Sequence, residues 1–117
     1  EDGLMGSKKL AETIKTTYPN TVFMINMDMV GRLNDKKDLT VGGVGTSPIL
    51  SDLVKKYKPE GFNLAVDESG VGPSDHTSFY LKDIPVLFLF TGTHNDYHKP
   101  TDDSDKINYS GGTVIAN

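Results

Sequence analysis

The chain of 117 residues has no cysteine, which excludes disulfide bridges and zinc sites built from cysteine. It has no apolar run that could cross a bilayer, because the longest, residues 84–90, is far shorter than the roughly 20 residues of a membrane-spanning helix. It also lacks a basic stripe, since sixteen acidic residues outnumber twelve basic ones and the net charge is -4. Binding to nucleic acid through its phosphates is therefore not expected.

Apolar segments alternate with segments of helical spacing, and this alternation is typical of an α/β fold with a largely parallel sheet. The near-continuous apolar run at residues 21–30 is typical of a strand buried on both faces. Ser7 and Ser47 are placed to begin helices as N-caps. The expected strands cover residues 21–30, 39–44, 62–66 and 84–90, and the expected helices cover residues 7–17, 47–58 and 75–81.

Asp28 is a carboxylate within an apolar strand, where burying it without a partner would be unfavourable. It needs a cation, a metal ion or several hydrogen-bond donors. Backbone N–H groups or Arg32 could satisfy it in a purely structural role. A metal could also do so, because sites in such folds form at the carboxyl ends of strands, and Asp28 lies near one such end.

Residues 91–102 crowd two histidines, a tyrosine and acidic residues into a loop after the second apolar strand. Neutral imidazole is a common ligand of catalytic zinc, although an isolated histidine in a loop is more often solvated. Because Asp28 is expected at a similar edge of the sheet, the pattern favours a metal site more than either segment would alone.

The adjacent Ser74, Asp75 and His76 do not form a serine-hydrolase triad, because consecutive residues at a helix start point apart. The chain also has no Gly-x-Ser-x-Gly elbow. We interpret Asp75 as a helix cap or a supporting residue and His76 as structural. The acidic residues 102–105 lack the glycine and the distal glutamate of an EF-hand loop, so a solvated turn is expected there.

Four blocks of the sequence, in order, resemble motifs of the di-zinc aminopeptidase family, whose relatives include glutamate carboxypeptidases and glutaminyl cyclases. They correspond to the end of a Glu-Glu-x-Gly-Leu-x-Gly-Ser motif, an Asp-Met-(Val/Ile)-Gly strand end, a Ser-Asp-His block and a motif in which an aspartate follows a histidine. The blocks are residues 1–7, 26–32, 74–79 and 96–102. The resemblance implies a three-layer α/β sandwich with a largely parallel mixed sheet, of which residues 1–117 form the C-terminal portion.

The resemblance also implies roles for individual residues. Glu1 and His98 match two ligands of one zinc ion, and Asp28 matches a ligand of the other. Tyr97 matches a tyrosine that hydrogen-bonds the tetrahedral intermediate in some members, while Asp75 would support the site from outside the ligand shell. The implied activity is zinc-dependent hydrolysis of N-terminal peptide bonds by a water that two metal ions activate.

Two parts of the family site have no counterpart in this sequence. In the family motif the general base directly precedes the position of Glu1, and an upstream His-x-Asp segment supplies further zinc ligands. We therefore expect the 117 residues alone to be inactive and to bind zinc weakly or not at all. We also expect them to self-associate through an uncovered sheet edge or core.

Two alternatives stay open at this point. One is a non-catalytic interaction domain with the same fold, and the other is a carboxypeptidase or glutaminyl cyclase, because loops set the specificity. The presence of Asp28, Tyr97 and His98 together favours an enzyme, since packing does not require that set. The expected partner is a peptide substrate, and the resemblance to relatives that are often exported implies a secreted or periplasmic location.

Overall fold

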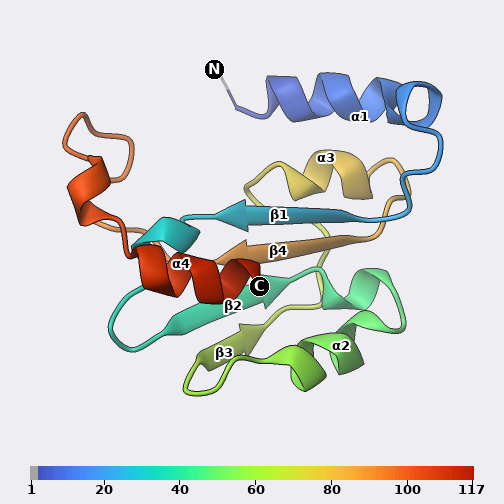
Figure 1. Ribbon diagram of the computed structural model, residues 1–117. Helices are drawn as coiled ribbons and strands as arrows, with labels where there is room; N and C mark the ends of the chain where they lie inside the picture. The colour runs from blue at the N-terminus through green and yellow to red at the C-terminus, as the bar shows by residue number, and fades with distance from the viewer. Residues whose placement is uncertain (1–2) are drawn as a thin grey trace.

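Four strands form a single mixed sheet in the order β1-β4-β2-β3 (Figure 1). In this computed structural model, which describes residues 3–117, β1 (Met24–Asp28) and β4 (Val86–Phe90) run parallel. β2 (Asp38–Gly42) and β3 (Asn63–Val66) also run parallel, whereas β2 and β4 are antiparallel. The expected α/β class and the largely parallel mixed sheet are confirmed.

Helices cover both faces of the sheet, because alternate residues along β4 point to opposite sides. On one face, Val86 packs with residues of α1 (Met5–Thr17) and α3 (His76–Tyr80). On the other face, Leu87 and Leu89 pack with residues of α2 (Leu50–Tyr57) and α4 (Tyr109–Ala116). The result is the three-layer arrangement that the resemblance implied. Within residues 3–117, no helix is both long and apolar enough to span a membrane.

Short 3-10 helices lie within three of the connections between the main elements. They are η1 (Val30–Arg32), η2 (Val44–Thr46) and η3 (Ser104–Lys106). η1 directly follows the end of β1, and η3 lies in the segment between β4 and α4. Both therefore belong to the edge of the sheet where the polar segments lie.

The two serine caps expected from the sequence are wrong. α1 begins at Met5, so Ser7 lies inside the helix, where its hydroxyl donates to the Leu4 carbonyl at 3.1 Å and lies 3.0 Å from the Ser78 hydroxyl of α3. α2 begins only at Leu50, and Ser47 contributes its carbonyl to the Leu50 N–H rather than its side chain. In both helices the chain ahead of the first turn makes backbone bonds in place of a side-chain cap.

The expectation that the first apolar strand is buried on both faces is also wrong. β1 is an edge strand of the described sheet, and Ile25 and Met27 on one face are 53% and 50% exposed. Ile25 lines an apolar groove of about 370 Å³ together with side chains of α2 and α4, including Tyr57 and Val114. This groove matches the expected uncovered core, and self-association through it stays a prediction.

Gly43 fixes the exit of β2, since it has a φ of 83° and a Cβ there would lie 2.4 Å from the Val86 carbonyl oxygen. Gly61 has a similar φ of 78°, but its Cβ would meet only the Lys37 ammonium at 3.7 Å. Gly61→Ala should cost about 1–2 kcal/mol, because a left-handed conformation disfavours a side chain. Gly43→Ala should cost about 1–3 kcal/mol more, because it adds a clash with backbone.

Urea unfolding of the two alanine variants beside the wild-type chain measures this difference. The matched φ values mean that Gly61→Ala controls for backbone strain alone. Equal losses of unfolding free energy in the two variants would show that β4 does not approach Gly43 as closely as described.

Candidate functional site

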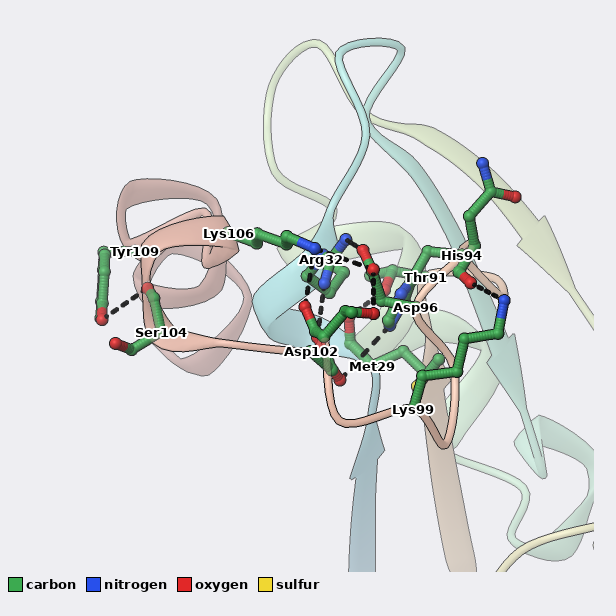
Figure 2. Close-up of polar contacts among 12 residues, drawn as sticks. Met29, Arg32, Thr91, His94, Asp96, Lys99, Asp102, Ser104, Lys106 and Tyr109 are labelled. Carbon is green, nitrogen blue, oxygen red and sulfur yellow. Dashed lines mark hydrogen bonds and ion pairs between the residues drawn. The ribbon is translucent and has the colours of Figure 1, made fainter.

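The carboxyl ends of β1 and β4 meet at one edge of the sheet, because the two strands run parallel with Asp28 opposite Phe90. A hydrogen bond then joins the segment that follows β1 to the segment that follows β4. Thr91, which follows β4, donates a short hydrogen bond from its hydroxyl to the Met29 carbonyl, which follows β1 (Figure 2). The Arg32 N–H donates to the same carbonyl at 2.8 Å. The expectation that the two polar segments share one edge is confirmed.

Asp28 is partly buried and takes its hydrogen bond from Ser74, whose hydroxyl lies 3.0 Å from Asp28 Oδ2. The amide of Asn26 donates to the same serine oxygen at 2.8 Å, which orients the hydroxyl toward the carboxylate. Ser74 is the residue of the Ser-Asp-His block that reaches the site, and the sequence reasoning missed it. The suggestion that Arg32 satisfies Asp28 is wrong, because Arg32 pairs with other carboxylates.

Asp75 and His76 follow Ser74 but face different surroundings. Asp75 is exposed and occupies the N-cap position of α3, but its side chain makes no capping hydrogen bond. Its alternative role in supporting the site stays a prediction. His76 is 1% exposed, and its ring stacks on Phe88 with 4.2 Å between ring centroids. Burial lowers the pKa of His76, against the opposing charges of Asp75 and Asp28. The structural role expected for His76 is confirmed.

Arg32 organises the loop that follows β4. Its guanidinium pairs with Asp96 at 3.0 Å through Nη2 and with Asp102 through Nη1 (Figure 2). Asp96 also accepts hydrogen bonds from Lys106 at 2.8 Å and from Thr101 at 2.7 Å. The bonds from Lys106, Thr101 and Arg32 together hold the pKa of Asp96 well below its ordinary value. The expected solvated turn at residues 102–105 is exposed throughout, and Asp102 within it also pairs with Arg32.

Tyr97 and His98 lie between these two aspartates and are both exposed. Their rings stack with 3.9 Å between centroids, and His98 has a φ of 54°, in the left-handed region. His94, the other histidine of the loop, is turned inward, and its Nε2 lies 3.8 Å from Asp102. The loop therefore presents one imidazole and one phenol to solvent and keeps the second imidazole inside.

The residues predicted to bind metal are only partly described. Asp28 and His98 lie on the two segments that converge, whereas Glu1 lies outside the described residues. Among residues 3–117, no group of three or more histidine, aspartate or glutamate side chains is arranged to hold a metal ion. The assignment of Glu1, Asp28 and His98 as ligands, and of Tyr97 as a catalytic group, stays a prediction.

Comparison with known proteins places the chain in context. The model of peptidase family M28 matches residues 1–116. Among solved structures, the LapA aminopeptidase of Legionella pneumophila is similar, with 25% identity and a TM-score of 0.74 over 97% of this chain and 33% of that chain. No curated protein sequence matches.

Two further aminopeptidase structures share the fold. One, from Aneurinibacillus sp. strain AM-1, has 29% identity and a TM-score of 0.71, covering 97% of this chain and 28% of that one. The other, BSAP, a zinc aminopeptidase from Bacillus subtilis, has 21% identity and a TM-score of 0.73, covering 97% and 30%. The present chain thus spans about a third of the length of these structures.

Protonation of the buried His76 should make stability depend on pH in a definite direction. Its pKa is lowered in the folded state, so the unfolded chain binds the proton more readily. The contribution of His76 is therefore complete above the unfolded pKa of about 6.5 and is lost as pH falls below it. Urea unfolding at pH 7.5 and 5.5 should show a larger loss for the wild type than for His76→Asn.

The asparagine variant keeps a polar group close to Asn26 but cannot take up a proton in this range. It is less stable at both pH values because the stacking on Phe88 is gone, so the comparison uses the pH-dependent difference alone. The same loss in both proteins on acidification would contradict the neutral, buried state of His76.

Proposed function

Because the chain belongs to peptidase family M28, we propose that it supplies part of a two-zinc aminopeptidase site that hydrolyses N-terminal peptide bonds. The observation that carries the proposal is the convergence of the Asp28 strand end with the loop that presents Tyr97 and His98. The similar structures support it, since LapA and the Aneurinibacillus protein are aminopeptidases and BSAP is a zinc aminopeptidase.

The donor groups at this edge fit zinc better than calcium or magnesium. Zinc accepts imidazole nitrogen together with carboxylate oxygen, whereas the harder ions take oxygen ligands. Within residues 3–117, Ser74 is the sole hydrogen-bond donor to the Asp28 side chain, and it binds one carboxylate oxygen, Oδ2. His98 is exposed and makes no polar side-chain contact within the same range. Asp28 and His98, with Glu1, are thus the residues that would hold the metal ions.

The chain's own groups would then bind and orient the substrate. When bound, a pair of zinc ions supplies a water of lowered pKa and polarises the scissile carbonyl. The Tyr97 hydroxyl, on the exposed side of the loop, would donate a hydrogen bond to the oxygen on which negative charge develops. The hydrogen bond from Ser74 would fix the orientation of the Asp28 carboxylate, as outer partners of metal ligands do.

The 117 residues alone are proposed to be inactive, since the glutamate that serves as general base in the family motif is not among them. A catalytic zinc site usually has three protein ligands and an open position. Of the proposed ligands, Asp28 serves one zinc ion, and Glu1 and His98 serve the other. We propose that full activity requires a domain of the length of the aminopeptidases, of which this chain spans about a third.

Replacement of the proposed ligands tests the function in a complete domain that contains this chain. Asp28→Asn and His98→Gln should each lower zinc content and reduce hydrolysis of aminoacyl-p-nitroanilides by about 100-fold or more. This is a larger loss than usually follows replacement of a residue that only hydrogen-bonds a metal ligand. Elemental analysis and initial rates measure the two effects. Asp103→Asn, an exposed acid in the same loop, is the matched control and should change the rate less than twofold.

Full zinc content and activity in both ligand variants would overturn the proposed function. Loss of activity with retained zinc would assign Asp28 or His98 to the substrate in place of the metal.

Tyr97→Phe separates the catalytic role of the hydroxyl from packing, because the stacked ring is kept. Removal of one donor to a developing oxyanion lowers kcat by about 100- to 1000-fold. We expect the decrease in kcat to reach that range or to be somewhat smaller, with little change in KM. Steady-state kinetics on the zinc-loaded domain measure both constants. An unchanged kcat would remove Tyr97 from the catalytic groups.

A further inference from the structure

Arg32 connects the end of the Asp28 strand to the loop of His98. It is the last residue of η1, which directly follows β1, and its side chain extends to Asp96 and Asp102 (Figure 2). These two aspartates flank Tyr97 and His98 in the sequence. One guanidinium therefore binds the loop on both sides of its exposed imidazole.

The other contacts of the loop do not join its central part to the β1 side, so Arg32 makes that connection. Lys106 and Thr101 also bind Asp96, but they belong to the same loop and close it only on itself. Thr91 bonds to the Met29 carbonyl at the start of the loop, and the Asn108 N–H bonds to the Gly31 carbonyl at its end, at 2.8 Å. Between these two anchors, the loop also forms ion pairs with the β1 side. Within the described residues, Arg32 is the partner that provides them.

The chemistry of arginine suits this position. A guanidinium is planar and always charged, and its N–H groups point in fixed directions, so two carboxylates bound to different nitrogens are held at a fixed separation. The side chains of Arg32 and Asp96 are each only 18% exposed, which reduces screening by solvent and salt. The contact to Asp102 is more open, with the aspartate 41% exposed.

The backbone of His98 needs such restraint. Its φ of 54° is unfavourable for a residue with a side chain, by about 1–2 kcal/mol. Strained conformations persist where the surroundings fix them from several sides. The ion pairs at Asp96 and Asp102 provide that restraint on the two sides of His98.

We propose that Arg32 is a positioning residue of the zinc site, which holds His98 and Tyr97 in a fixed place relative to Asp28. The inference rests on the proposed function for what the loop binds, but the restraint on the loop is independent of metal. In this role Arg32 would act through Asp96 and Asp102 and would not itself touch metal or substrate.

Hydrogen exchange and zinc affinity of the complete domain test the proposal together. In the metal-free domain, Arg32→Met should speed amide exchange at residues 94–102 by about tenfold or more and leave the sheet amides unchanged. Zinc affinity should fall by about 10- to 100-fold, as it does when outer partners of metal ligands are removed. Arg32→Lys keeps the charge but lacks the planar guanidinium with its separate donor nitrogens. Its zinc affinity should therefore lie between those of Arg32→Met and the wild type.

Two further variants keep the test decisive. Lys9→Met removes a surface ion pair with Glu12 on α1, and it should leave both loop exchange and zinc affinity within twofold of wild type. Asp102→Asn should weaken zinc binding in the wild-type background and add little to Arg32→Met, because both changes break the same pair. If Arg32→Met does not fold, Arg32→Lys and Asp102→Asn carry the comparison.

The outcomes separate this inference from the proposed function. Wild-type loop exchange and zinc affinity in Arg32→Met would overturn the positioning role, as would faster exchange with unchanged affinity. A wild-type domain that binds no zinc would overturn the proposed function and the role of Arg32 toward metal. In that case the exchange comparison would still decide whether Arg32 restrains the loop.

Discussion

The parallel register of β1 with β4 is the constraint on which the rest of the site depends. Because Asp28 lies opposite Phe90, the chain leaves both strands at the same level, and the two polar segments begin as neighbours. A slip of one residue would turn Asp28 to the other face of the sheet. The alternation along β4 fixes this register, since Val86 packs under α1 and α3 while Leu87 and Leu89 pack under α2 and α4.

Much of this could be predicted from the sequence, because it follows from hydrophobic pattern. The apolar runs predicted the strands, and the position of Asp28 at the end of one run placed it at the edge of the sheet. The predicted burial of β1 on both faces failed, since Ile25 and Met27 are exposed. A run of apolar residues shows what a strand can bury but not which segments are present to cover it. α4 was not predicted, because Gly111 and Gly112 weaken the helical signal.

The partners of the charged groups could not be predicted, because they depend on directions that sequence spacing does not give. Arg32 is close to Asp28 in the sequence, yet Met29 between them has a φ of 63°, which turns the chain sharply after the strand. The guanidinium consequently points toward the loop after β4 and not toward Asp28. In the same way, Ser74 and Asp75 are adjacent, but only the hydroxyl reaches the carboxylate of Asp28.

The two halves of the proposed site are supported from opposite directions. Asp28 is held through Ser74 and Asn26, and this network ends at the buried ring of His76 on the α3 side of the sheet. His98 is held through Arg32, on the side where the loop returns toward α4. Within residues 3–117 the two networks share no residue. They are connected through the backbone between Asp28 and Arg32 and through β4, whose Phe88 stacks on His76 and which leads into the loop of His98. The segment after β1, with Met29 bonded by Thr91, and the pairing of β1 with β4 therefore both constrain how the carboxylate lies relative to the imidazole.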